Sequence, residues 1–359
     1  MKRRVKAVHV VVPQGIDDPA RPSGGNTYDR RLIAGLAALG WQVSQEDAPG
    51  SWPCPDRRDR AALGALLGRL QRGSTVVVDG LVASAAPELL VPQAGRLRLV
   101  VLVHMPLGQP VASPDVVAAR AREGAVLSAA ASVVTTSRWS RDWLIRHYAL
   151  APGRLHVAEP GVDPAEPAPG TASGGRLLCV GAVTPVKGHD LLVSALAAVL
   201  DLPWRCDCVG ALDIDPAFVQ GLGHRIRQLE VGDRVHLCGP LTSADLAAAY
   251  AEADLLVLAS RFETYGMVVS EALAHGLPVV ATDVGGVREA LGQAPDGSRP
   301  GVLVQSEDAP ALADALRHWL DDATARGRLR RSAAQRRAAL PAWASTSERV
   351  SRVLDGVAA

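Results

Sequence analysis

Two glutamates eight residues apart are the residues of this sequence best placed to do chemistry. Glu263 and Glu271 lie in "SRFETYGMVVSEALAHGLPVVATDVGG", where an aliphatic run precedes the first and a Gly-Leu-Pro turn follows the second. The pattern predicts a buried strand over 255–259, a loop that contains Glu263, and a helix from Met267 to His275 with Glu271 about one turn inside it. Both carboxylates can then point into one cleft.

The segment between the two glutamates should supply free backbone amides, because the first N–H groups of a helix have no partner within it. These amides belong to Tyr265, Gly266 and Met267. Amides bind an anion and carboxylates bind hydroxyl groups, and a nucleotide sugar has both. The structural alternative is a pair of surface glutamates, although Glu271 lies among aliphatic residues where an unpartnered carboxylate is costly.

A glycine pair near the start of the chain is a second candidate site. Gly24 and Gly25 follow the first expected strand and precede an amphipathic helix with Asn26 or Thr27 as its N-cap. Glycine lets backbone amides approach an anion, and a helix N-terminus adds partial positive charge. An ordinary strand-to-helix turn explains the pair equally well on its own.

Two basic residues also follow expected strands. His104 in "VLVHMPLG" stands at the carboxyl end of a central strand, where α/β sheets place their ligand crevices. Lys187 in "GAVTPVKGHD" lies in the first strand-to-helix loop of the second half and can act as a point charge on a diphosphate. A structural histidine and a solvated lysine are the respective alternatives.

We predict no metal site. Asp213-Ile214-Asp215 has the Asp-x-Asp pattern by which one class of sugar-transferring enzymes binds a metal ion, but it precedes Pro216 and a helix, where capping is the better interpretation.

Short aliphatic runs alternate with longer segments of helical period through the whole chain, which predicts βα units around parallel sheets. A Pro/Gly/Ala/Ser-rich stretch at 159–175 reads as a surface linker near the midpoint. We therefore predict an N-terminal Rossmann-like domain over 1–165 and a C-terminal one over 175–340. Pro341 should break the path and free a last helix over 341–359 to take a new direction.

Bulk properties exclude several function classes. The chain has 359 residues, 48% of them hydrophobic, which is enough for two cores. A net charge of +1 gives no general attraction to nucleic acid, and the Arg-rich run 326–337 reads as a solvated helix face. We expect no membrane span and no signal peptide. Five cysteines without a Cys-x-x-Cys pair favour buried free thiols and a cytoplasmic location.

Taken together, "SGGNTYDRRL", "EPGVD", "VGAVTPVKGHD", "GPLTSADLAAAYAEADLLVLASR" and "FETYGMVVSEALAHGLPVVATDVGG" resemble the retaining glycosyltransferases of family 4, in the family's order and over nearly the whole chain. That resemblance implies the GT-B fold, two Rossmann-like domains across a cleft with the last helix crossing back to the first domain. It implies a metal-independent transfer of a sugar from a UDP- or GDP-sugar to an acceptor hydroxyl, with no cofactor.

The resemblance also implies roles for single residues. Glu271 would bind the ribose hydroxyls, Glu263 the transferred sugar and Lys187 the diphosphate. Gly24 and Gly25 would close on the diphosphate, and His104 would hydrogen-bond the donor sugar. The remaining expected donor contacts are walls of the base pocket, the helix amides and a second cation: Pro240, Leu241, Tyr265, Gly266, Met267 and Arg261.

One departure from the family pattern bears on the diphosphate. The family usually has a Gly-Arg pair early in the second domain, where this chain has Gly181-Ala182. Arg261 is the candidate to replace the missing charge. A nucleotide-sugar 2-epimerase and a non-catalytic binding protein of the same fold are the alternative functions.

Overall fold

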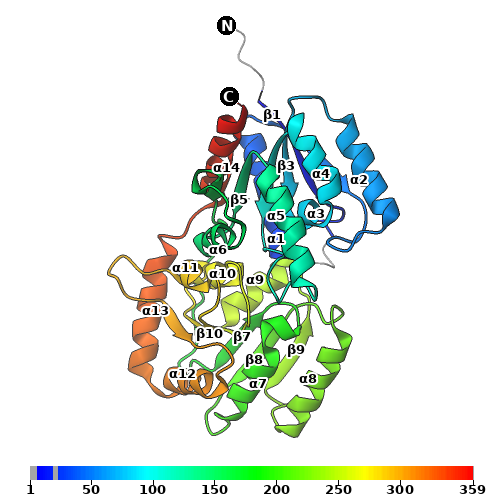
Figure 1. The fold of residues 1–359 in the computed structure, drawn as a ribbon. Helices are drawn as coiled ribbons and strands as arrows, with labels where there is room; N and C mark the ends of the chain where they lie inside the picture. The colour runs from blue at the N-terminus through cyan, green and yellow to red at the C-terminus, as the bar shows by residue number, and fades with distance from the viewer. Residues whose placement is uncertain (1–5, 19–22, 359) are drawn as a thin grey trace. The chain divides into compact units, whose positions relative to one another are not determined.

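The computed structural model of the protein describes residues 6–18 and 23–358, and it divides into two compact units. Unit 1 comprises residues 1–161 and 341–359, and unit 2 comprises residues 162–340. Each unit contains one six-stranded sheet with only parallel pairings between neighbours (Figure 1). This is the α/β class with two Rossmann-like domains expected from the sequence, and the expectation is confirmed.

In unit 1 the strand order is β2-β1-β3-β4-β5-β6. The strands are β1 Ala7–Pro13, β2 Gln42–Ala48, β3 Thr75–Asp79, β4 Arg98–Val103, β5 Ser132–Thr135 and β6 Leu155–Val157. The helices are α1 Gly24–Ala38, α2 Arg57–Arg69, α3 Gly80–Ala85, α4 Pro87–Leu90, α5 Val116–Ala129, α6 Arg138–Tyr148 and α14 Trp343–Ala358.

In unit 2 the order is β12-β11-β10-β7-β8-β9. The strands are β7 Arg176–Val180, β8 Arg205–Val209, β9 Val235–Gly239, β10 Leu255–Leu258, β11 Val279–Thr282 and β12 Gly301–Val304. The helices are α7 His189–Ala197, α8 Pro216–Gln228, α9 Ser243–Glu252, α10 Met267–Ala274, α11 Val287–Leu291, α12 Ala309–Asp321 and α13 Ala323–Arg337.

The aliphatic runs of the sequence became the strands. Each of the twelve strands overlaps one of the short aliphatic runs of the sequence, such as "STVVVDG" for β3 and "DLLVLAS" for β10. Both faces of each sheet are buried, because Val76 and Val78 of β3 contribute to one core of unit 1 while Val77 contributes to the other. A sheet that is covered on both faces needs strands that are apolar at every position, which is why these strands could be predicted from the sequence. The short helices α3 and α4 were not predicted.

The stretch 159–175 is not a free linker. The Glu159 carboxylate accepts from Arg349 at 2.6 Å within unit 1, and the unit boundary falls at Gly161, four residues before the predicted one. A Cβ on Gly161 would overlap the backbone at Trp343, so glycine is needed where α14 passes. Residues from Val162 onward belong to unit 2.

Arginines of α13 hold this stretch against unit 2, which corrects the prediction of a solvated basic face. Arg337 donates to the Ala165 carbonyl and to that of Ala274, and Arg326 donates to the Ala172 carbonyl. Arg330 donates to the Thr171 carbonyl. A guanidinium offers five N–H donors, so one side chain can satisfy several carbonyls that lack a sheet or helix partner.

Asp254 is the buried anchor of the same region. Its carboxylate is fully buried and accepts from the Thr171 backbone and hydroxyl, from the Arg176 amide and from Arg330. Asp254→Asn replaces one accepting oxygen by an NH₂ group that faces donors. We expect it to lower the free energy of unfolding by about 1–3 kcal/mol, measured by denaturant titration. Asp201→Asn at an exposed pair with Arg317 is the control, and an equal change in both variants would contradict the anchoring role.

The last helix returns to unit 1. Val350 and Leu354 of α14 join the core that contains Tyr28 and Leu32 of α1, and Figure 1 shows α14 beside that unit's sheet. The predicted change of direction after Pro341 and the return of the helix are therefore present.

The cysteines are all free, but only part of the prediction about them holds. Cys179, Cys206 and Cys208 are buried, whereas Cys54 and Cys238 are exposed. Cys54 lies in the loop after β2 and Cys238 on the edge strand β9, so neither occupies a core position. Among the described residues, no helix combines the length and the hydropathy required to cross a bilayer.

Candidate functional site

The topology of unit 2 brings two sequence-distant loops to one crevice. Strand order runs away from β7 in one direction through β8 and β9, and in the other through β10 to β12. Loops at such a reversal point leave a crevice at the carboxyl ends of the two central strands. The loop after β7 carries Lys187, and the loop after β10 carries Glu263.

Lys187 and Glu263 meet at this crevice. The Lys187 Nζ lies 2.6 Å from Glu263 Oε1, and the Ser260 hydroxyl donates to the same oxygen at 2.8 Å. The lysine side chain is 30% exposed and the glutamate side chain 10% exposed, so the pair is largely but not fully buried. Because both bonds use Oε1, the other carboxylate oxygen is left for a ligand hydroxyl.

Glycines fix the backbone around this pair. Gly188 has φ +67°, and a Cβ there would overlap the Ala259 carbonyl oxygen. Gly285 has φ +53° and lies directly against the Glu263 backbone, and the Gly286 amide donates to the Glu263 carbonyl at 3.1 Å. Close backbone approach of this kind is possible only without a side chain. The Gly-Gly at the end of "TDVGG" was a readable signal of it.

Helix α10 begins beside Glu263 with an uncapped N-terminus. Gly266 precedes the helix with φ +90° and no side-chain cap, and Tyr265 before it is buried. The Val269 amide donates to the Gly266 carbonyl at 2.9 Å. The anion-binding role of the Tyr265, Gly266 and Met267 amides stays a sequence-based prediction.

Glu271 is held by a residue that sequence reasoning missed. The Tyr250 hydroxyl donates to Glu271 Oε2 at 2.8 Å, and the Tyr250 ring stacks on His275 with 5.2 Å between centroids and 13° between planes. Burial raises the pKa of Glu271, the Tyr250 hydrogen bond opposes that rise, and the charge of Asp163 adds to it. Tyr250 lies four residues before "DLLVL", and nothing in the sequence around it distinguishes it from an aromatic residue of the hydrophobic core.

Arg261 is bonded to neighbours within unit 2, and its predicted donor-binding role stays a prediction. It makes five hydrogen bonds, two to Asp190, two to Glu307 and one to the Pro185 carbonyl. Five is the full donor capacity of a guanidinium, so no N–H remains for a phosphate. Arg261 ties the Lys187 loop to its neighbours through Pro185 and Asp190.

The two predicted base-pocket residues lie just after β9. Leu241 lines a cavity of about 300 Å³ together with Arg205, Asp207 and Glu252, and Arg205 pairs with Asp207 at 2.5 Å. Pro240 is exposed and is not among the residues that line this cavity. The wall role of Pro240 therefore stays a sequence-based prediction.

In unit 1 the glycine pair opens helix α1. The N-cap is Ser23, whose hydroxyl accepts from the Asn26 amide at 3.0 Å, so the predicted caps Asn26 and Thr27 are wrong. Ser23, three residues before Asn26, has the extended backbone that capping requires. Gly24 and Gly25 thus occupy the first turn of α1, where backbone amides have no hydrogen-bond partner within the helix.

His104 belongs to a buried cluster with two carboxylates that sequence reasoning also missed. Its Nε2 lies 2.9 Å from Asp29 Oδ1 and 3.5 Å from Asp79 Oδ2. Asp79 ends β3 and Asp29 lies in α1, so both come from elements next to the strand that ends before His104. Burial lowers the pKa of His104, but the charge and hydrogen bond of Asp29 and the charge of Asp79 raise it to about 9.

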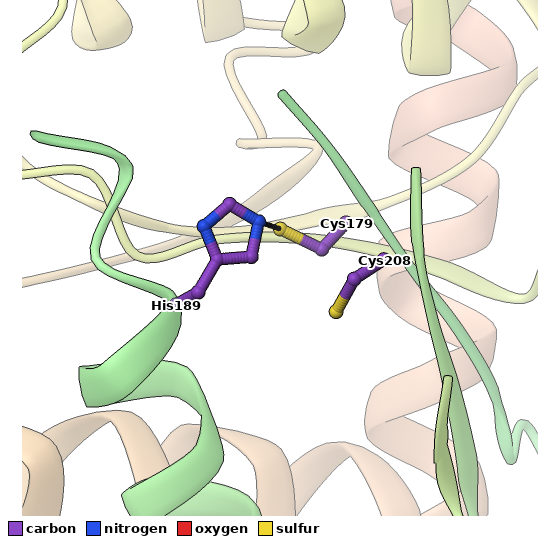
Figure 2. A group of neighbouring side chains, drawn as sticks. All are labelled: Cys179, His189 and Cys208. Carbon is purple, nitrogen blue, oxygen red and sulfur yellow. Dashed lines mark hydrogen bonds between the residues drawn. The ribbon is translucent and has the colours of Figure 1, made fainter. Parts of the chain in front are cut away.

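A third polar cluster lies inside unit 2. Figure 2 shows the Cys179 thiol against His189 Nε2, 3.7 Å apart, with Cys208 alongside on β8, and all three residues are buried. Metal ligation through Nε2 would place a proton on Nδ1, which has no partner among the described residues. Metal-bound histidines normally donate that proton to a neighbour, and a buried donor without one costs about 1–3 kcal/mol. The geometry favours a packed cluster of thiols and an imidazole over a metal site.

Comparison with known families matches both halves of the chain. The family model "Glycosyltransferase Family 4" matches residues 7–166, and "Glycosyl transferases group 1" matches residues 174–322. The two matches meet near the boundary between the compact units.

Two curated relatives are named for the same activity. D-inositol 3-phosphate glycosyltransferase 1 of Catenulispora acidiphila is 35% identical over 298 residues, which are 77% of this chain and 68% of that protein. D-inositol 3-phosphate glycosyltransferase of Kineococcus radiotolerans is also 35% identical, over 63% of this chain and 57% of the relative. The chain thus spans little more than half the length of the second relative.

Solved structures share the fold at low identity. Sucrose-phosphate synthase from Thermosynechococcus elongatus has a TM-score of 0.80 at 21% identity and covers 98% of both chains. Anabaena HepE in complex with UDP and glucose has a TM-score of 0.77 at 18% identity, over 97% of this chain and 99% of that one.

Proposed function

Because this chain belongs to glycosyltransferase family 4, we propose that it is a retaining, metal-independent hexosyltransferase that moves a sugar from a nucleotide-diphosphate donor to an acceptor hydroxyl. Its membership of the family makes this chain a glycosyltransferase. The donor class, the stereochemical course and the independence from metal are proposals.

The contact between Lys187 and Glu263 carries the proposal. A cation and a carboxylate from two different loops meet at the crevice of a Rossmann-type sheet, at 2.6 Å. The uncapped start of α10 follows Glu263 directly, and Glu271 lies one turn further on. Positive charge, a helix N-terminus without a side-chain cap and carboxylates in that order are complementary to a diphosphate between two hydroxyl-rich sugars.

The proposed chemistry uses the leaving group itself. Lys187 and the amides of α10 would stabilise the negative charge that develops on the departing diphosphate. A phosphate oxygen would take the proton of the acceptor hydroxyl while that hydroxyl attacks the anomeric carbon from the same face. Glu263 would hold a hydroxyl of the transferred sugar, and Glu271 the ribose.

Substrate candidates for the first assays come from the related proteins. UDP-glucose is the first donor to test because HepE was crystallised with UDP and glucose, and D-inositol 3-phosphate is the first acceptor because the curated relatives are named for it. The five free cysteines support a reducing compartment, and we propose the cytoplasm.

A donor panel tests the proposal. The protein is assayed with UDP-, GDP- and ADP-sugars, with and without acceptor and with EDTA, and the product anomer is assigned by NMR. We expect transfer with one donor class, an anomeric configuration equal to that of the donor, and no loss with EDTA. Neither binding nor turnover with any donor would remove the proposal, and donor conversion without acceptor would point to an epimerase.

A further inference from the structure

The protein contacts His104 at one ring nitrogen and along one ring edge. Nε2 faces Asp29 and Asp79, while the Cγ–Cδ2 edge lies against Gly25, where an added Cβ would be 3.5 Å from Cδ2. Tyr28 meets the ring edge-on, with 5.1 Å between centroids. The imidazole side chain is 14% exposed, and the edge these contacts leave uncovered is the one with Nδ1.

The charges around Nε2 favour a protonated ring. Asp29 is 1% exposed, and among the described residues His104 is its ion-pair partner. Its second oxygen, Oδ2, is buried without a hydrogen-bond partner among those residues. An isolated carboxylate in such surroundings is costly, so the adjacent imidazole must supply the compensating charge.

Asp79 is the second carboxylate beside His104, and it also has a structural role as a helix cap. Its Oδ1 accepts from the Leu81 amide at 2.6 Å and caps α3, and its Oδ2 is the oxygen that faces His104. Asp79 is therefore rigidly placed by a backbone contact, and it holds the imidazole plane from a second direction.

We propose that Asp29 and Asp79 are positioning residues that hold His104 as an imidazolium anchored through Nε2, so that its Nδ1–H is donated to a substrate oxygen and the residue does not act as a general base. This inference rests on the proposed transfer for its substrate and deepens it. His104 then cannot accept the acceptor's proton, which in the proposed transfer leaves on the departing phosphate.

The titration behaviour agrees with this geometry. The pKa of His104 is raised to about 9, so the ring keeps its proton below that pH and loses it as pH rises through 9. Burial and the charge of Asp29 raise the pKa of Asp79, and His104 opposes the rise. Tyr28 stays neutral because burial raises its pKa, and Arg349 of α14 lowers it only in part.

The charge state is tested by NMR of ¹⁵N-histidine-labelled full-length protein without substrate. His104 is assigned by its absence in His104→Gln, and the ring is followed from pH 6 to above pH 9. We expect two protonated ring nitrogens in wild type through pH 8, with an inflection near 9. In Asp29→Asn the inflection should fall to about the ordinary histidine value of 6.5 or below. Burial lowers the pKa of His104, and the variant lacks the Asp29 charge that raises it.

The catalytic consequence is tested by kcat/KM across the same pH range. Wild type should stay flat to pH 8, whereas Asp29→Asn should lose about tenfold between pH 6 and 8 as its ring deprotonates. Asp79→Asn keeps the capping oxygen and should show a smaller shift in the same direction. Asp115→Asn, at the exposed cap of α5, should match wild type.

Two results would overturn the proposal. One is a wild-type His104 that titrates near 6.5, and the other is an Asp29→Asn variant with unchanged titration and pH profile. If Asp29→Asn does not fold, the wild-type titration and Asp79→Asn decide. Because the NMR arm needs no substrate, failure of every donor would remove the transfer proposal without altering the measured charge state.

Discussion

Lys187→Ala should lower kcat about 10²–10³-fold, the usual effect of removing one group that stabilises a developing oxyanion. Lys187 is the cation that the loop after β7 places at the crevice, and Ala182 stands where an arginine is expected. Since Arg261 uses all five donors on Asp190, Glu307 and Pro185, it has no free N–H with which to replace Lys187. Single-turnover and steady-state rates with the best donor measure the effect.

A second variant is needed to separate the loss of Lys187 from the loss of its ion pair with Glu263. Lys187→Ala leaves Glu263 without its cation, so part of any loss reflects a disturbed carboxylate rather than a missing phosphate contact. The double variant with Glu263→Gln removes that ambiguity, and it should be no worse than the more damaged single variant if the pair works as a unit. Arg317→Ala, at an exposed pair with Asp201, is the matched control and should keep activity within about twofold. Wild-type kcat in Lys187→Ala would exclude the lysine from the site.

Glu271→Gln should raise the Kd for the donor about 10- to 100-fold, because hydrogen bonds to a charged group contribute about 1.5–3 kcal/mol. Its proposed partner is the ribose, so the loss should be equal for the nucleoside diphosphate and for the complete nucleotide sugar. Tyr250→Phe removes only the hydroxyl that orients Glu271 and should cost about three- to tenfold. Isothermal titration calorimetry measures all three proteins.

A deoxyribose analogue of the nucleoside diphosphate makes this test specific. Wild type should bind the analogue more weakly than the parent ligand, and Glu271→Gln should no longer distinguish the two. Glu88→Gln, at an exposed pair with Arg60, should behave as wild type. If Glu271→Gln still discriminates between ribose and deoxyribose, the carboxylate does not contact the sugar hydroxyls.

Much of the fold was readable because both sheets are covered on both faces. A strand buried on two sides must be apolar at every position, so "STVVVDG" and "DLLVLAS" stand out from the helices around them. Helix starts were less certain where two capping residues compete, and α1 begins at Gly24 because Ser23 caps it. The stretch 159–175 misled the prediction, since its composition is that of a linker while Arg330 and Arg337 bind its carbonyls.

Sequence alone determined the fold class, the family resemblance and the identity of Glu263, Glu271, Lys187 and His104 as candidate residues, because these depend on local pattern and on spacing along the chain. Tertiary structure decided their partners. Lys187 is paired with Glu263, Tyr250 orients Glu271, and Asp29 and Asp79 flank His104. Each of these contacts joins residues at least 21 positions apart, and a hydrogen bond across such a distance is set by how strands and helices pack rather than by any neighbouring residue.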